Sequence, residues 1–303
     1  MERTPLSDAS VYPLVYIAWW LLSQHDSRSS ESWGPRWLAA AVGQALRYAM
    51  GCLGTHSSVL LDGITEEELR ELSPAVLPIV PHGPLALGIL TLCMPRLRME
   101  RRFLPLRGLA SSAPFLFRVP LLRELLLLLA VREADPRSLD RFLSTGHSLL
   151  LHPGGAWERA STSSEREVLY VDGKLSFVRL ALKHGRPLLP MYAFGENQLY
   201  TAHSYWMRHR QWIASKLNVG IPLVTGRLGT PVPHAVPKYC LVLGTPIRLG
   251  PPNPEPTEAQ VMEVYGRWAA EVRRLFDKHK GDLLPQPVAA RGLAIQLCTS
   301  SKL

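Results

Sequence analysis

Short apolar runs alternate along this chain with longer segments of helical periodicity, and this alternation constrains the fold more than any other sequence feature. Short apolar runs bounded by turn residues are typical of strands that are buried on both faces of a sheet. The expected strands are Ala75–Val80, Ser148–Leu151, Leu188–Tyr192 and Tyr239–Leu243. The helical patterns are Pro114–Val131, Ser138–Ser144, Phe177–His184 and Glu258–Lys280. This order predicts an α/β fold with a central sheet flanked by helices.

Composition limits the partners of such a fold. The 303 residues, 47% of them hydrophobic, can bury a sizeable core, and 34 Lys and Arg against 25 Asp and Glu give a net charge of +9. This charge favours a phosphate-bearing metabolite, an anionic membrane surface or nucleic acid as partner. No RNP-type strand or zinc finger is present, so we expect no nucleic-acid partner. The GxSxG, P-loop and GxGxxG patterns are also missing, which disfavours serine hydrolase and nucleotide chemistry.

The N-terminal region, residues 1–56, combines two apolar segments. Val11–Leu22 is shorter than the ~20 apolar residues that span a bilayer, and it carries Trp19 and Trp20, a residue type common at membrane interfaces. Trp37–Leu53 spaces its apolar residues at helical intervals. We expect both to be helices of a membrane-associating region, and docking on the protein's own core remains the alternative.

The rest of the chain divides into a predicted catalytic domain and a tail. No internal repeat or low-complexity block interrupts residues 57–282, which we interpret as one domain. Residues 283–303 contain Pro285, Pro287 and Gly292 and are expected to form a flexible tail. The chain ends in Ser301-Lys302-Leu303, which matches the peroxisomal address motif.

Three expected strands end in loops that combine glycine with polar side chains. His82 lies between Pro81 and Gly83 after the first strand, and Gly154, Gly155, Glu158 and Arg159 follow the second. Gly195, Glu196 and Asn197 follow the third. Each loop alone is compatible with an ordinary turn with solvated charges. Because chemistry in such sheets collects at the carboxyl ends of the strands, the three together favour a site.

The assembled residues resemble the type 2 diacylglycerol acyltransferase family, which includes monoacylglycerol and wax-alcohol acyltransferases. The resemblance is most specific over Lys174–Gly185 and Leu189–Asn197, similar to the family's Arg-Lys-Gly-Phe-Val, Val-Pro and Phe-Gly-Glu-Asn block. Further matches bring its extent to Val76–Lys280. The family implies a central sheet like that of the glycerolipid acyltransferases, acyl-CoA as co-substrate, a lipid alcohol as acceptor, and no metal or other cofactor.

Two motifs of the family also have counterparts in this sequence, and some residues in these and neighbouring motifs differ from the family pattern. Val80-Pro81-His82-Gly83 takes the position of the family's His-Pro-His-Gly, so Val80 replaces the first histidine. Gly154, Gly155 and Glu158 match Gly-Gly-Ala-x-Glu, but His152-Pro153 precedes them where the animal enzymes carry aliphatic residues. Ser176 replaces a motif glycine. These departures leave acyl transfer as the expected reaction and the acceptor open.

The mechanism that we expect from these residues assigns a role to each of them. His82 removes the proton of the acceptor hydroxyl, which attacks the acyl-CoA thioester directly, and Glu158 orients the imidazole. Backbone N–H groups stabilise the oxyanion, and side chains bind substrate. The backbone groups are those of Gly83, Gly154 and Gly155. The substrate-binding residues are Glu196, Asn197 and four candidates for the CoA phosphates, Arg159, Arg179, Lys183 and Arg227.

The expected product is triacylglycerol made from diacylglycerol. The alternatives are a wax, phytyl ester or monoacylglycerol acyltransferase, and a catalytically silent lipid-binding scaffold. The family resemblance implies the endoplasmic reticulum membrane or a lipid droplet as location, whereas Ser301-Lys302-Leu303 indicates the peroxisome. No oligomeric state is predicted.

Overall fold

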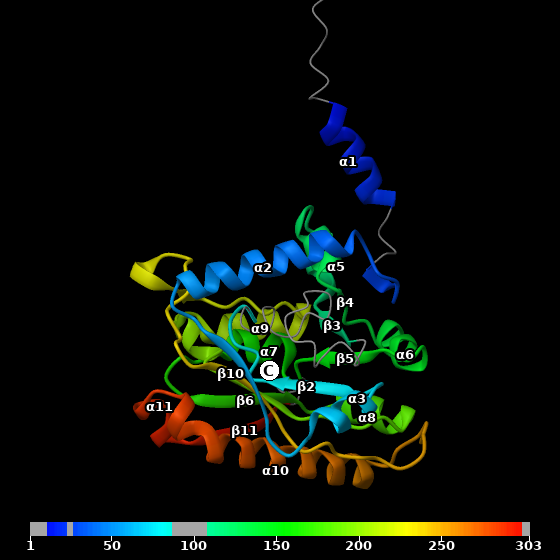
Figure 1. Cartoon of the computed structure of the whole chain (residues 1–303), viewed down its shortest axis with the longest axis vertical. Helices are drawn as coiled ribbons and strands as arrows, with labels where there is room; N and C mark the ends of the chain where they lie inside the picture. The colour runs from blue at the N-terminus through cyan, green and yellow to red at the C-terminus, as the bar shows by residue number, and fades with distance from the viewer. Residues whose placement is uncertain (1–10, 23–26, 87–107, 299–303) are drawn as a thin grey trace, which may run out of the picture.

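The computed structural model describes residues 11–22, 27–86 and 108–298 and has a seven-stranded sheet at its centre (Figure 1). The strand order is β1-β10-β7-β2-β5-β3-β4. The strands are β1 (Ser57–Leu61), β2 (Val76–Val80), β3 (Gly108–Ser112), β4 (Val131–Glu133), β5 (Ser148–Leu151), β7 (Met191–Phe194) and β10 (Tyr239–Leu243). The expected α/β architecture is confirmed.

Strand direction sets where the loops meet. The five strands from β7 to β4 are mutually parallel, while β10 runs antiparallel to β7 and β1 runs parallel to β10. In the register, Val80 pairs with Tyr192 and Pro78 pairs with Leu151. The carboxyl ends of β2, β5 and β7 therefore lie side by side at one edge of the sheet.

Helices and short helical turns surround this sheet, except α1, which projects away from it (Figure 1). They are α1 (Val11–Leu22), α2 (Arg36–Cys52), α3 (Glu66–Glu71), η5 (Pro114–Arg118), α5 (Leu122–Leu128), α6 (Pro136–Ser144), α7 (Gly155–Ser161), α8 (Ser176–His184), η6 (Asn197–Leu199), α9 (Met207–Leu217), η7 (Arg227–Gly229), α10 (Glu258–Leu283) and α11 (Gln286–Arg291). The smaller sheets pair β6 (Glu167–Asp172) with β11 (Leu293–Cys298) and β8 (Thr201–Ala202) with β9 (Val224–Thr225).

Alternate residues of the central strands enter different cores. Val76 and Val80 of β2 pack in a cluster with residues of α8 and α10, whereas Leu77 and Ile79 pack in a second cluster on the other face. This two-residue period follows from the pleat, which turns successive side chains to opposite faces. Both faces are covered, so β2 is apolar throughout and was recognisable in the sequence.

The expected helix Pro114–Val131 is wrong as one element. It divides into η5 and α5, because Pro120 lacks a backbone N–H and disfavours helical geometry in the residue before it. Leu121, between the two, takes a left-handed conformation with φ +65°. The last residue of the predicted helix, Val131, begins the edge strand β4.

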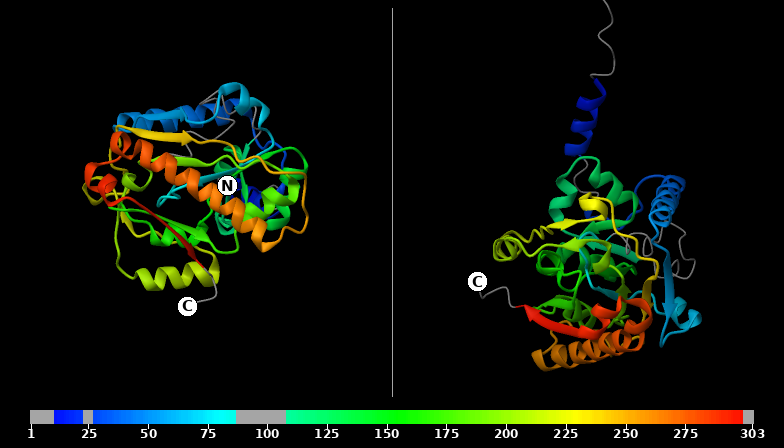
Figure 2. Two further views of the ribbon diagram at one scale, coloured as in Figure 1. Left: turned by 90° about the horizontal axis from the view of Figure 1, so that it is seen from below. Right: turned by 90° about the vertical axis from the view of Figure 1, so that its left-hand side faces the viewer.

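The expected flexible tail is also wrong over most of its length. Val288 and Ala289 of α11 are buried in the main core. Strand β11 pairs in parallel with β6, from Leu293 opposite Glu167 to Cys298 opposite Asp172, and lies beside α10 (Figure 2). The terminal Ser-Lys-Leu motif lies outside the described residues.

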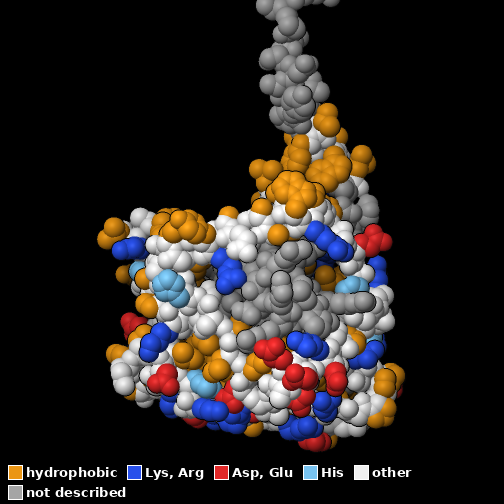
Figure 3. Space-filling view, viewed as in Figure 1, with side chains coloured by type: hydrophobic (Ala, Val, Ile, Leu, Met, Phe, Trp, Pro, Cys, Tyr) orange, Lys and Arg blue, Asp and Glu red, His pale blue; other side chains and the backbone are white. Residues whose placement is uncertain are grey.

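The N-terminal region is attached to the domain through a buried arginine. The Arg123 guanidinium of α5 lies 5.1 Å from the Trp19 ring centroid and 5.6 Å from that of Trp20. The Tyr16 hydroxyl donates to Glu124 at 2.8 Å. Apolar side chains remain exposed around this junction (Figure 3), among them Ile17, Leu21, Leu22, Trp37, Val119 and Leu121. Within the described ranges, no helix combines the length and the apolar character needed to cross a bilayer.

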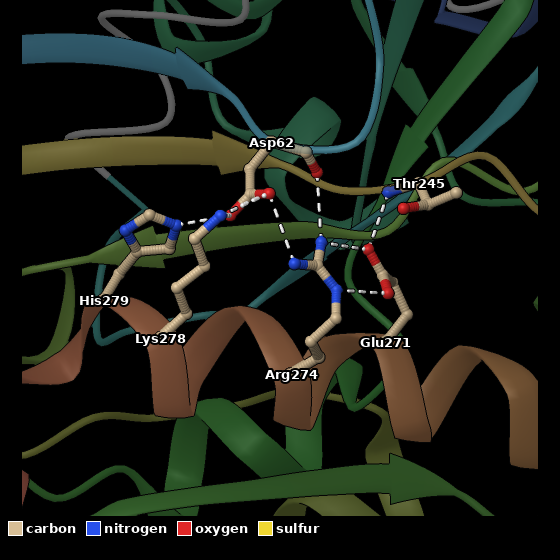
Figure 4. Close-up of polar contacts among 6 residues, drawn as sticks. All are labelled: Asp62, Thr245, Glu271, Arg274, Lys278 and His279. Carbon is tan, nitrogen blue, oxygen red and sulfur yellow. Dashed lines mark hydrogen bonds and ion pairs between the residues drawn. The ribbon is translucent and has the colours of Figure 1, made fainter.

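A polar cluster joins the end of β1 to α10 (Figure 4). The buried carboxylate of Asp62 accepts from Arg274 at 3.2 Å, Lys278 at 3.1 Å and His279 at 2.6 Å. Burial alone would raise the pKa of Asp62, but these hydrogen bonds lower it to about 2. Because β1 runs opposite to β2, this cluster lies at the other edge of the sheet from the loop after β2.

Candidate active site

Two imidazole rings meet where β2 and β5 end. His82 follows β2 by one proline, and His152 directly follows β5, so the parallel register brings both to the same edge. Their ring centroids are 4.2 Å apart, with an interplanar angle of 35°. The sequence predicted His82 as a site residue and noted His152 only as a departure from the family motif. The signal that could have identified it is its position directly after a buried parallel strand, equivalent to that of His82.

Backbone carbonyls fix the tautomer of both rings. Nδ1 of His82 lies 2.9 Å from the carbonyl oxygen of Gly83, and Nδ1 of His152 lies 3.0 Å from that of Ile79. A carbonyl oxygen only accepts, so each Nδ1 carries a proton and each Nε2 carries a lone pair. Burial lowers the pKa of His152 to about 4. Burial, followed by electrostatic repulsion from Arg159 and from His152 when protonated, holds the pKa of His82 well below its ordinary value. Both rings are therefore neutral, proton-accepting groups at pH 7.

Glu158 contacts the backbone of His82 instead of its ring. Its Oε1 accepts the His82 backbone N–H at 3.2 Å, and the side chain is buried. Burial raises the pKa of this carboxyl to about 8, although the hydrogen bond from His82 opposes the shift. The expected role of orienting the imidazole is thus corrected. Glu158 is a mostly neutral group at pH 7 that holds the loop on which His82 lies.

Glycine is required at two positions next to the histidines. A Cβ on Gly154 would lie 1.8 Å from the backbone oxygen of Tyr170. At Gly83, φ is +62° and a Cβ would lie 2.5 Å from Cγ of Glu196. The Gly155 N–H donates to the His152 carbonyl at 3.1 Å. This occupied amide corrects the prediction that Gly155 stabilises an oxyanion.

Glu196 and Asn197 belong to buried polar networks. Glu196 accepts from the Tyr239 hydroxyl at 2.8 Å. Asn197 accepts from Thr162 at 3.0 Å and donates to Glu167 at 3.1 Å. Both side chains are buried, and these contacts give them a structural role, while their role in binding substrate stays a prediction.

A cavity of about 660 Å³ opens beside the histidine pair. His152 is among its lining residues, and His82 is not among those that the described part of the chain contributes. The loop after β5 and the helices α7, α8 and α9 form its wall, and β11 adds Cys298. Burial raises the pKa of the Cys298 thiol to about 11. This volume is within the range of pockets that bind small ligands.

A second pocket, of about 610 Å³, adjoins this cavity, and its lining includes three basic and two acidic residues, the acids being Asp140 and Glu255. Pro136, Ser176 and Leu180 line both. The basic lining side chains of this second pocket are those of Arg137, Arg179 and Lys183. Two of the predicted phosphate ligands, Arg179 and Lys183, therefore lie together, and Arg137 is one that the sequence analysis missed.

These two cations are paired with acids, and the other predicted phosphate ligands lie elsewhere. Arg179 pairs with Glu258, and Lys183 pairs with Asp140. Arg159 donates to the backbone oxygen of Pro84 at 3.0 Å, and its charge acts on both histidines. Arg227 is exposed in η7 and lines neither pocket. Phosphate binding at Arg227 stays a prediction, and neither pocket includes this residue. Within the described ranges, no three His, Cys, Asp or Glu side chains gather as a metal site.

Comparisons with known proteins show which families and relatives the chain is similar to. A family model described as diacylglycerol acyltransferase matches residues 54–286. The chain is 28% identical to diacylglycerol O-acyltransferase 2-like protein 6 of Mus musculus, over 92% of this chain and 84% of that protein. It is 29% identical to 2-acylglycerol O-acyltransferase 1 of Bos taurus and 28% identical to diacylglycerol O-acyltransferase 2 of Homo sapiens. Each of these two alignments covers 66% of this chain, and they span 64% and 55% of the respective relatives.

Among solved structures, the chain is similar to the 1-acyl-sn-glycerophosphate acyltransferase PlsC of Thermotoga maritima. The TM-score is 0.47 and the sequence identity 15%. The similarity covers 92% of this chain and 94% of that one.

Proposed function

The chain belongs to the diacylglycerol acyltransferase family, and from this premise we propose that it transfers a fatty acyl group from acyl-CoA to the hydroxyl of a glycerolipid. The preferred acceptor is diacylglycerol, which gives triacylglycerol. One observation carries the proposal beyond the family: His152 lines a ligand-sized cavity at the carboxyl edge of a parallel sheet, and its ring packs beside that of His82.

The proposed reaction is a direct transfer without an acyl-enzyme. The acceptor oxygen attacks the thioester carbonyl as its proton passes to an imidazole of the His82–His152 pair. The carbon–sulfur bond then breaks, and the imidazolium returns the proton to the leaving CoA sulfur. Arg159 carries a positive charge close enough to affect both rings. We propose that this charge stabilises the oxyanion of the tetrahedral intermediate.

The second pocket, which Arg137, Arg179 and Lys183 line, is a suitable place for the CoA part of the substrate. We propose that its phosphates contact Arg137, Arg179 and Lys183 while the thioester enters the cavity. The two spaces share lining residues, so one extended molecule can occupy both. Phosphate oxygens form charge-assisted hydrogen bonds with guanidinium groups, and they would compete there with the carboxylates of Glu258 and Asp140.

We also propose that residues 1–56 associate with a membrane. The exposed side chains of α1, α2 and the η5–α5 connection support this, since such contiguous apolar surface is typical of lipid or protein contacts. A lipid acceptor is dissolved in a bilayer, which favours the endoplasmic reticulum or a lipid droplet as location. The peroxisome is the alternative, and N-terminal fluorescent fusions with and without residues 301–303 separate the two.

The full-length protein in microsomes tests the reaction. Labelled oleoyl-CoA is offered with diacylglycerol, monoacylglycerol, a long-chain alcohol or phytol, and ester and free CoA thiol are quantified together. We expect both in equal amounts, with triacylglycerol as the main product. Wax or phytyl ester as the main product would show that the preferred acceptor is a long-chain alcohol or phytol and not diacylglycerol. Acyl-CoA binding with no ester from any acceptor would contradict acyl transfer and favour a silent scaffold.

A further inference from the structure

The short helical turn η7 presents an exposed leucine at its tip. The side chain of Leu228 is 94% exposed, more than any other large hydrophobic side chain in the described part of the chain. Its backbone is left-handed, with φ +55° and ψ +28°, a conformation that is unfavourable for a residue with a Cβ. Leu228 therefore strains the backbone and buries almost no surface in return, so the fold itself gives no reason for an apolar side chain there.

Backbone hydrogen bonds hold this turn in one shape. The Gly226 N–H donates to the Thr230 carbonyl and the Arg227 N–H donates to the Val232 carbonyl, each at 2.7 Å. The Thr230 hydroxyl donates to the Arg227 carbonyl, also at 2.7 Å. Glycine is required at residue 226, since a Cβ would lie 1.8 Å from the Val232 oxygen. A backbone that is already fixed loses little entropy when a partner covers the turn, so Leu228 is presented ready to bind.

The turn lies beside the C-terminal end of α2. Thr55 joins the two, because its hydroxyl donates to the His234 carbonyl at 3.4 Å and accepts the Val236 N–H at 3.1 Å. Figure 1 shows η7, in yellow, level with α2 at the end of the molecule from which α1 projects, while α10 lies at the opposite end. Helix α2 itself exposes Trp37 and Tyr48. The apolar side chains of the N-terminal region and the tip of η7 thus belong to the same end of the molecule.

The segment that contains η7 has no acidic residue. From Asn197 to Pro254 the sequence has six Lys and Arg and no Asp or Glu. Arg227, next to Leu228, is exposed and lines neither pocket. On the face drawn in Figure 3, acidic side chains gather towards the α10 end. An anionic surface is therefore complementary to the end of the molecule on which η7 lies.

We propose that η7 is a second membrane anchor of this protein, which inserts Leu228 among the acyl chains and places the Arg227 guanidinium beside lipid phosphates. The partner of this surface is an anionic bilayer leaflet. One projecting apolar side chain next to a cation suits a lipid surface better than a protein, because a stable protein interface buries ~1,200 Å² or more. The anchor is separate from residues 1–56 and does not depend on acyl transfer.

A second anchor fixes the orientation of the domain on the membrane. Trp19 of α1 contacts Trp33, just before α2 begins, with ring centroids 6.3 Å apart, whereas η7 lies at the other end of α2. The 17 residues of α2 span about 25 Å. Two contacts that far apart prevent the domain from turning about a single point. The cavity then keeps a constant position relative to the leaflet that holds a lipid acceptor.

Flotation of the full-length protein with vesicles tests the anchor. Protein purified in mild detergent is mixed with increasing amounts of lipid, the detergent is removed, and the floated fraction gives a partition coefficient. The vesicles contain phosphatidylcholine alone or mixed with phosphatidylserine, and no substrate is added. Failure of acyl transfer is therefore distinct from failure of this proposal.

The informative variant is Leu228→Gly, which removes the apolar side chain and suits the left-handed backbone. We expect it to lower the partition coefficient about tenfold with both kinds of vesicle, because one leucine side chain no longer leaves water. Its melting temperature should stay the same or rise, a result that a structural role for Leu228 would not give. Arg227→Gln should weaken binding only to vesicles with phosphatidylserine, and added salt should remove that difference.

Met262→Ala is the matched control, because it shortens an exposed apolar side chain of α10, at the opposite end of the molecule. It should bind both kinds of vesicle as the wild-type protein does. If Leu228→Gly fails to fold, Leu228→Asn replaces it, since asparagine also tolerates the left-handed conformation. The proposal is overturned if the Leu228 variant binds vesicles as tightly as Met262→Ala, including the case in which it loses a protein partner instead.

Discussion

The carboxyl of Glu158 provides a quantitative test of how this site is built, through the substitution Glu158→Gln. Burial raises its pKa from an ordinary 4.5 to about 8 in the folded protein. Between these values the folded state holds a proton that the unfolded state has lost, so the free energy of unfolding falls as pH rises. From pH 5 to pH 8 this amounts to about 3 kcal/mol, at 1.36 kcal/mol per unit of pKa.

Glutamine removes this pH dependence while keeping the shape of the side chain. Its amide oxygen can still accept the His82 N–H, and any constant effect of the change cancels when two pH values are compared. Relative to wild type, Glu158→Gln should therefore gain about 3 kcal/mol of unfolding free energy between pH 5 and pH 8. At pH 5 the two proteins should be similar.

Urea unfolding followed by tryptophan fluorescence measures this difference, in a mild detergent at several pH values. Glu263→Gln is the matched control, because it removes a carboxyl from the exposed face of α10. Its profile should run parallel to that of wild type. If the difference between Glu158→Gln and wild type stays constant within about 1 kcal/mol, Glu158 does not hold a proton at neutral pH, and our description of the His82 loop is wrong.

Three further predictions concern stability. Gly154→Ala should lower the melting temperature far more than Gly155→Ala. A Cβ at residue 154 would collide with a backbone oxygen of β6, whereas a Cβ at residue 155 meets no atom and is disfavoured only by the positive φ of 49°. Equal effects in a thermal melt would contradict this. Asp62→Asn should lower the free energy of unfolding by about 1–2 kcal/mol at pH 7. The effect is this small because Arg274 and Lys278 are partly exposed and solvent screens their ion pairs with Asp62. That difference should disappear as pH falls from 4 to 2 in urea titrations, since the folded carboxylate has a pKa of about 2. Deleting residues 292–303 removes the partner strand of β6 and one cavity wall, so it should lower the melting temperature and raise KM for acyl-CoA, whereas deleting 301–303 should change neither.

The sequence predicts elements well where both faces of a strand are buried. β5 and β10 lie at the predicted residues, and β2 begins one residue later, because their apolar runs are continuous. The bounds predicted for the third strand are wrong: β7 begins three residues and ends two residues later than Leu188–Tyr192, although it is equally buried. In β6, buried side chains alternate with partly buried ones, and in β11 partly buried side chains are interspersed with exposed ones. Their pairing depends on a partner more than a hundred residues away, so local periodicity could not show that the tail is a strand.

The site shows the same division between local and tertiary information. His82 was found because a histidine in a Pro/Gly loop after a strand is unusual by itself. The stacking of His152 depends on the register of β2 with β5, which no local pattern contains. Glu196 and Asn197 match a specific family motif, but their partners, Tyr239 and Glu167, lie on other strands, and those contacts give them a structural role.

The central claim is that acyl transfer takes place in the cavity beside the histidine pair. An experimental structure of the full chain with a non-hydrolysable thioether analogue of acyl-CoA tests it most directly. We predict that the CoA phosphates lie among Arg137, Arg179 and Lys183 and that the atom next to sulfur lies beside His152. An analogue bound with its sulfur outside this cavity would contradict the account.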